Sequence, residues 1–171
     1  MRTQLVLTMI GPDRPGLVEL VSATLVKFGA NWEDSQMARL AGKFAGILRA
    51  SVAAEQAEAL QSALRKLDTN DLKIIVELVP ESATSETGPM LRLELTGSDH
   101  EGIVREVTRI LATHDVNVEE LATKKQSAPM TGEFIFTATA VLKPPSTLSI
   151  DTLRTALEQI ADDLAVEITL A

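Results

Sequence analysis

The chain has 171 residues, of which 45% are hydrophobic, so it can bury the core of one ordinary domain or of two small ones. Its net charge of -8 is uneven: residues 1–80 carry nine basic and nine acidic side chains, and residues 90–171 carry seven and thirteen, which argues against direct nucleic-acid binding. The sequence lacks cysteine, an 18-residue apolar run and a signal-peptide pattern, so we expect no disulfide, no membrane span and a cytoplasmic location.

The hydrophobic period changes along the first half of the chain in a regular order. Residues 3–10 alternate as a strand, and apolar residues at helical spacing predict a helix from Leu17 to Phe28. Two further strands, "NWEDSQMARL" and "KFAGILRASV", flank a predicted hairpin turn at Ala41 and Gly42. A second helix and the strand "LKIIVELV" complete the series.

The second half repeats the first. Sliding the sequence on itself by 86 residues superimposes Gly11 on Gly97, together with many apolar positions. After a four-residue insertion around "SAPM", we expect the match to resume with Gly42 and Phe44 against Gly132 and Phe134. The polar stretch between the copies reads as a linker. We therefore predict domains at 1–80 and 90–171, joined by a linker at 81–89.

Each copy has the order strand, helix, strand, strand, helix, strand. Two one-sided helices can cover an alternating sheet only if they share one face, which predicts an α+β class with two ferredoxin-like (βαββαβ) domains, each a four-stranded antiparallel sheet with two helices on one face. In copy one the opposite sheet face is apolar and should carry Val6, Thr8, Ile10, Ile47 and Ile75. A bare face of this kind marks an interdomain or subunit contact.

The motif "GPDRPG" in copy one returns as "GSDHEG" in copy two, between the first strand and the first helix. The backbone N–H groups that begin a helix lack partners, so this turn is a candidate anion site. Asp13 or Asp99 can cap the helix, Pro15 suits its first turn, and Gly16 and Gly102 leave room for close approach. A cap and a packing glycine without any ligand explain the same residues.

These residues carry a resemblance. The segment "LTMIGPDRPGLVELVSATLVKFGANWED" resembles the start of an ACT domain, and "LELTGSDHEGIVREVTRILATHDVNVEE" is similar without the proline. Two copies covering nearly the whole chain look most like the glycine cleavage system transcriptional repressor group. Copy one is also similar to the N-terminal domain of formyltetrahydrofolate deformylase, whose catalytic domain has no counterpart here.

The resemblance implies regulation through a small ligand, often an amino acid, bound where two copies meet. A carboxylate could sit on the N–H groups after the aspartates, Arg14 could clamp it, and His100 would do so more weakly. By resemblance, the two asparagines would approach the turn of the adjoining copy, although each also suits a loop before a strand. The candidate ligand-binding residues are Asp13, Arg14, Pro15, Gly16, Leu17 and Asn31, and Asp99, His100, Glu101, Gly102, Ile103 and Asn117.

No combination of nucleophile and base, and no set of metal ligands, stands out in the sequence, so we expect no catalysis, no metal and no cofactor. The resulting hypothesis is a regulatory protein that binds a small amino acid, glycine among the candidates, and modulates a transcription factor by protein contact. We expect a homodimer. The alternatives are a regulatory subunit of a separate metabolic enzyme and a ligand-free dimerisation module.

Overall fold

The computed structural model describes residues 1–79, 89–128 and 132–171, which fall into two compact units, Met1–Ser85 and Glu86–Ala171. Most of the linker predicted at 81–89 lies outside the described residues. In the described part of the chain, no helix is long and apolar enough to cross a membrane.

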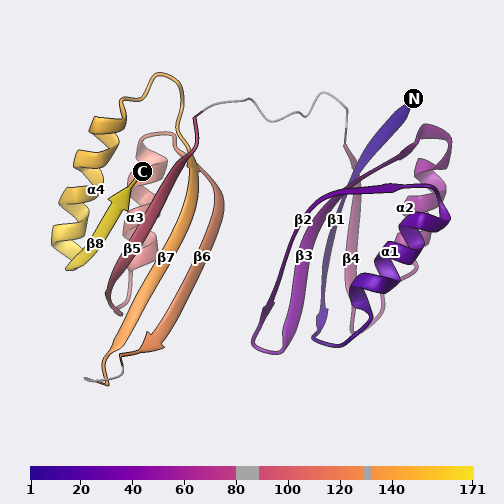
Figure 1. Ribbon diagram of the computed structural model, residues 1–171, viewed down its shortest axis with the longest axis horizontal. Coiled ribbons are helices and arrows are strands. Elements are labelled where there is room, and N and C mark those ends of the chain that lie inside the picture. Colours follow the sequence, from indigo (N-terminus) through magenta and orange to yellow (C-terminus); the bar gives the residue numbers. More distant parts are fainter. Residues whose placement is uncertain (80–88, 129–131) are drawn as a thin grey trace. The chain divides into compact units, whose positions relative to one another are not determined.

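The first unit is a four-stranded antiparallel sheet with two helices on one face (Figure 1). Its strand order is β2-β3-β1-β4, so the first strand occupies the centre of the sheet. A short 3-10 turn over Ala54–Gln56 was not expected from the sequence. The elements are β1 (Arg2–Pro12), α1 (Leu17–Lys27), β2 (Asn31–Leu40), β3 (Lys43–Ala53), α2 (Ala57–Arg65) and β4 (Lys73–Val79).

The second unit repeats this topology with strand order β6-β7-β5-β8. Both units therefore have the predicted ferredoxin-like order, and the α+β prediction is confirmed. The elements are β5 (Leu91–Ser98), α3 (Ile103–Thr113), β6 (Asn117–Ser127), β7 (Phe134–Lys143), α4 (Ile150–Leu164) and β8 (Val166–Leu170).

Strand alternation decides which side chains form each core. In β1, Leu5, Leu7 and Met9 are fully buried beneath the helices, because successive side chains of a strand point to opposite faces. The intervening Thr8 pairs with Ile47 on β3 and with Ile75 on β4, so these residues share the opposite face, as predicted. No helix of the unit covers that face (Figure 1).

The β2–β3 hairpin turns where the sequence predicts it. Ala41 and Gly42 both have positive φ angles, of 49° and 76°. Two successive left-handed residues form the turn type whose twist matches that of the flanking strands. This hairpin brings Arg39, near the end of β2, close to the turn that precedes α1.

The corresponding register in the second unit differs from the prediction. Gly11 pairs with Phe44, and its repeat partner Gly97 pairs with Phe136. Phe44 is therefore equivalent to Phe136 and not to Phe134, so the second unit has six inserted residues between these equivalent positions and not four, since 92 − 86 = 6. Sequence matching was wrong here because Phe134 lies only two residues away on the same strand.

The first glycine of each motif lies in the sheet, beside the last strand of its unit. An added Cβ at Gly97 would lie 2.5 Å from Cγ1 and 2.9 Å from the backbone Cα of Val166. At Gly11 the nearest atom would be the flexible Leu72 Cδ1, at 3.0 Å. The two glycines are equivalent in sequence, but the backbone atoms nearest the added Cβ lie at ordinary contact distances of 3.4 and 3.6 Å at Gly11, so only Gly97 would clash with a neighbouring main chain.

We predict that Gly97→Ala lowers the free energy of unfolding of the second unit by about 1–3 kcal/mol, because β8 must shift. Gly11→Ala is the matched control and should cost less than about 1 kcal/mol, because Leu72 can change rotamer. Urea unfolding followed by circular dichroism measures both units, and the single tryptophan, Trp32, reports the first unit alone. Equal losses for the two variants would contradict this account.

Candidate ligand-binding turns

The second glycine of each motif starts the helix. Gly16 and Gly102 are the N-cap residues, with φ angles of 94° and 95°. This left-handed conformation is accessible to glycine at little cost. An added Cβ would meet nothing within 4 Å at either position, so the constraint is the backbone angle and not crowding. Pro15 lies before the cap, and so outside the first helical turn where we expected it.

The aspartates do not cap the helices, which corrects the sequence prediction. Neither helix has a side-chain hydrogen bond at its N-cap. Asp13 instead pairs with Arg39 Nη1 at 3.0 Å, and Asp99 pairs with Lys125. Each aspartate lies three residues before the left-handed glycine that begins the helix. Its carboxylate therefore points toward the cation on β2 or β6 and not toward the helix.

Backbone bonds hold the same aspartates on the hairpins. The N–H of Asp13 donates to the carbonyl of Gly42 at 2.9 Å, and that of Asp99 donates to the carbonyl of Phe134 at 2.8 Å. Gly42 and Phe134 are equivalent in the observed register. The repeated aspartate therefore anchors the turn to the hairpin, and this local role explains its presence in both units without a ligand.

An open groove of about 410 Å³ lies at the turn of the first unit. Leu20 is the first residue of α1 whose N–H is bonded within the helix, to the Gly16 carbonyl at 2.9 Å. The preceding N–H groups of the helix have no intrahelical partner, and no side chain caps them. The groove is lined by Asp13, Arg14, Pro15, Gly16, Leu17, Val18, Glu19 and Phe44.

Three lining residues, Val18, Glu19 and Phe44, were not among the predicted site residues. Glu19 lies in the first turn of α1, is exposed, and lines the same groove as Arg14. Its position three residues after the glycine could have identified it, because carboxylates are favoured in the first turn of a helix. Phe44 reaches the groove from β3, and only the strand register relates it to the turn.

The turn of the second unit makes different side-chain contacts. His100 Nε2 lies 2.9 Å from the Leu164 carbonyl at the end of α4, and Nδ1 lies 3.1 Å from the Glu101 carbonyl. Carbonyl oxygens only accept, so both bonds require the doubly protonated ring. The bond to Leu164 raises the pKa of His100, with further contributions from Glu101 and the charge of Asp99. His100 thus ties the turn to α4.

Several predicted site residues have side chains outside the turns. Leu17 and Ile103 are buried in the two cores, so only their backbone can face a ligand. Asn31 pairs with Ser51, whereas Gly11 pairs with Phe44, which places Asn31 at the far end of the same sheet. Asn117 has the equivalent position and donates to Glu119 Oε1 at 2.6 Å. Glu101 is exposed. Contact of either asparagine with another copy stays a prediction.

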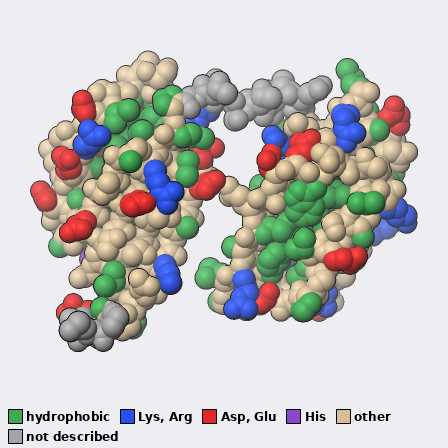
Figure 2. All heavy atoms as spheres, in the orientation of Figure 1, with side chains coloured by type: hydrophobic (Ala, Val, Ile, Leu, Met, Phe, Trp, Pro, Cys, Tyr) green, Lys and Arg blue, Asp and Glu red, His purple; other side chains and the backbone are tan. Residues whose placement is uncertain are grey.

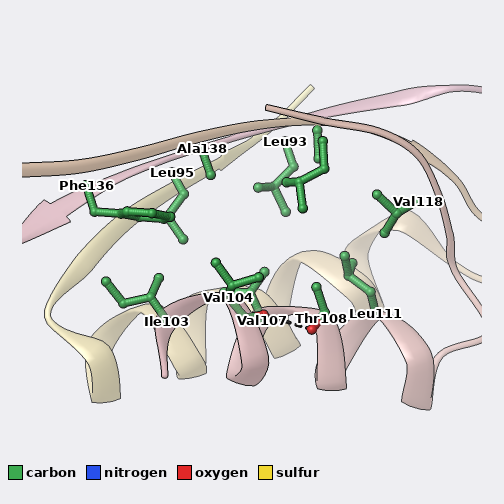
Figure 3. Close-up of a pocket in the computed structure, with 12 residues that line it drawn as sticks. Leu93, Leu95, Ile103, Val104, Val107, Thr108, Leu111, Val118, Phe136 and Ala138 are labelled. Atoms are coloured by element: carbon green, nitrogen blue, oxygen red, sulfur yellow. Dashed lines mark hydrogen bonds between the residues drawn. The ribbon is translucent and has the colours of Figure 1, made fainter. Parts of the chain in front are cut away.

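The second unit also contains an apolar cavity of about 30 Å³ between α3 and the sheet. Figure 3 shows side chains of α3 facing Leu93, Leu95 and Phe136, with Val118 at one end. Trp32 is the residue of the first unit that corresponds to Val118. The Thr108 hydroxyl is bonded to the Val104 carbonyl at 2.8 Å, so the cavity offers no free polar group to hold an amino acid.

Hydrophobic side chains also reach the surface of the first unit where α1 and β2 lie side by side (Figure 2). Trp32, Met37 and Phe44 are partly buried and pack against the core of this unit. Among the residues that the structure describes, no group of three or more metal-ligating side chains is present.

Comparison with known proteins assigns the fold to a family. Residues 3–77 match the ACT domain family. The first unit is therefore an ACT domain. The glycine cleavage system transcriptional repressor of Escherichia coli (strain K12) is 26% identical over 125 residues, which cover 72% of this chain and 66% of that repressor. The chain thus spans about two thirds of the length of this curated relative.

Solved structures extend the similarity across both units. A crystal structure of a protein of unknown function from Galdieria sulphuraria is 32% identical, covers 99% of this chain and 98% of its own, and has a TM-score of 0.86. A protein designated as a glycine cleavage system transcriptional repressor is 18% identical, with coverages of 100% and 97% and a TM-score of 0.71. At that identity the second match supports the fold alone.

The turn of the second unit generates a pH prediction. The pKa of His100 is raised above 6.5 in the folded chain, so its stabilising effect is full below that value and is lost as the pH rises through the folded-state pKa. We therefore expect the melting temperature of the second unit to fall between pH 6 and pH 8. The decrease should be smaller in His100→Gln, as measured by circular dichroism melting.

His114→Gln removes the chain's other histidine, at the end of α3, and serves as the control. It should retain the pH dependence of the native chain. Trp32 emission, which follows the first unit, should give a melting curve with the same pH response in native and His100→Gln chains. An unchanged pH response of the circular dichroism melt in His100→Gln would show that the ring does not hold the turn.

Proposed function

We propose that this chain is a non-enzymatic regulatory protein that binds a small amino acid at the turn of its first unit. The observation that supports this proposal is that the unpaired N–H groups at the start of α1 lie at the same groove as Arg14 and Glu19. The N–H groups and Arg14 match an α-carboxylate, and Glu19 matches an ammonium group. Glycine is a candidate because a zwitterion without a side chain needs only these two partners.

The second turn is the weaker candidate. Its histidine is engaged with the Leu164 carbonyl, and Arg105 occupies the position equivalent to Glu19. A basic residue there offers nothing to an ammonium group. Asp13, Pro15, Gly16 and Leu17 act in the first turn through the backbone and its anchoring. We therefore assign ligand binding to the first turn.

The readout of ligand binding would be contact with another protein. The E. coli relative is a transcriptional repressor of the glycine cleavage system, and the acidic second unit argues against direct contact with nucleic acid. We propose that ligand occupancy changes association with a transcription factor, by an amount limited to the difference in ligand affinity between free and associated states. A regulatory subunit of a metabolic enzyme is the alternative.

Calorimetric titration of the full chain tests the ligand site. Glycine should bind saturably, and serine, alanine and the branched-chain amino acids should define the size limit. Arg14→Gln and Glu19→Gln should each weaken binding by about tenfold or more, because each removes a charge-assisted hydrogen bond. Both residues are exposed, so the variants should keep native stability.

Arg105→Gln is the matched control, since it changes the residue equivalent to Glu19 in the second unit. It should bind like the native chain. Saturable binding that is weakened by Arg105→Gln and not by Glu19→Gln would move the site to the second turn. The absence of binding by every amino acid tested would favour the ligand-free interaction module, in which the turns serve only to begin the helices.

Affinity capture from cells tests the partner. The tagged chain should retain a transcription factor in an amount that changes with the amino acid bound in the calorimetric test. Arg14→Gln is the control and should capture the same partner without responding to the ligand. Recovery of metabolic enzymes alone would count against the transcriptional readout and would support the regulatory-subunit alternative.

A further inference from the structure

The sheet of the first unit has an apolar face that its helices do not cover (Figure 1). Register places Ile75, Thr8 and Ile47 in one row across β4, β1 and β3. Ile75 is 61% exposed and Ile47 is 49% exposed, and Ile10 on the adjacent row is 47% exposed. These three isoleucines form one patch, which we call the isoleucine face.

The fold itself does not require this patch. The equivalent row of the second unit consists of Thr169, Glu94 and Thr139. Both units bury similar cores beneath their helices, so core packing does not account for the isoleucines on the uncovered side of the first sheet. Three exposed isoleucines in one unit and polar side chains at the same places in the other point to a contact made by the first unit alone.

Two charged residues on β4 determine how a second copy can be oriented on this face. Lys73 and Glu77 lie on β4, two residues before and two residues after Ile75, so all three side chains point to the same face. Consider a two-fold axis that lies between two facing sheets and runs along the middle row, perpendicular to the strands. This axis places β4 of a second copy antiparallel to the first β4, so that opposite ends of the two strands face each other. It places each Lys73 over the Glu77 of a second copy, while Ile75 and Ile47 meet their own counterparts. The face is thus complementary to itself.

We propose that the isoleucine face binds a second copy of this chain, with the two sheets packed face to face and their β4 strands antiparallel. Lys73 also lies 3.3 Å from Asp68 Oδ1, and its ammonium retains further donors for Glu77 of the second copy. Glu77 makes none of the ion pairs found among the described residues of the first unit. Arg49 is already neutralised by Glu33 and Asp34.

The size of the face sets the expected strength. Four strands spaced about 4.8 Å apart, over the seven residues of β4, cover roughly 450 Å² on each chain. Twice this area lies at the lower end of specific interfaces, so association should be reversible and dependent on concentration. The inference specifies the homodimer expected above, but it uses none of the ligand contacts of the first turn.

Sedimentation velocity of the full chain over a range of concentrations tests the arrangement. Lys73→Glu and Glu77→Lys each place like charges opposite one another twice in the dimer, and should raise the dissociation constant by about tenfold. The double variant Lys73→Glu/Glu77→Lys restores opposite charges and should associate like the native chain. Asp68→Asn controls for loss of the internal pair and should leave association unchanged.

Ile47→Glu gives a second, independent reading. It should abolish the dimer, whereas Thr139→Glu, the equivalent change on the second unit, should not. Circular dichroism of every variant checks folding, and these side chains are exposed. A chain that is monomeric at all concentrations, or a dimer insensitive to Ile47→Glu and to charge reversal, would overturn the inference and leave the face to another partner.

Failure here can be told apart from failure of the proposed ligand site. The glycine titration on Ile47→Glu measures binding in the monomer. A monomeric native chain that binds glycine refutes only the face-to-face dimer. A native dimer that binds no amino acid refutes only the ligand site.

Discussion

The left-handed glycine that begins α1 and α3 is the constraint on which the rest of each unit depends. It reverses the chain between the central strand and the first helix, and so directs the helix back over the sheet. It also leaves the first N–H groups of the helix without a side-chain cap. The aspartate three residues before the glycine does not cap the helix. Its side chain instead pairs with a cation on β2 or β6, which holds the turn against the hairpin.

The three fixed residues of the motif act on different parts of the unit. The first glycine lets the central strand lie against the last one, the aspartate binds the hairpin, and the second glycine sets the helix. A ligand is not needed to explain why the motif occurs twice. What distinguishes the units is the side chains between these positions: Arg14 leaves an open groove, and His100 reaches across to α4.

Much of the fold could be predicted because alternation and helical spacing are local. Leu5, Leu7 and Met9 identified the core face, and Ala41 with Gly42 located the hairpin. The aspartate contacts could not be read in the same way, because Arg39 and Lys125 are brought near only when β2 and β6 join their sheets. The link from His100 to Leu164 spans 64 residues and leaves no pattern in the sequence.

The engagement of His100 with α4 has a consequence for the proposed ligand response. If only the first turn of each chain takes a ligand, a single chain has one site and its occupancy follows a simple hyperbola. Cooperativity then cannot arise within the chain, because a Hill coefficient cannot exceed the number of coupled sites. A sharper response would have to come from the number of chains in the assembly, so gene duplication would have supplied a second scaffold and not a second sensor.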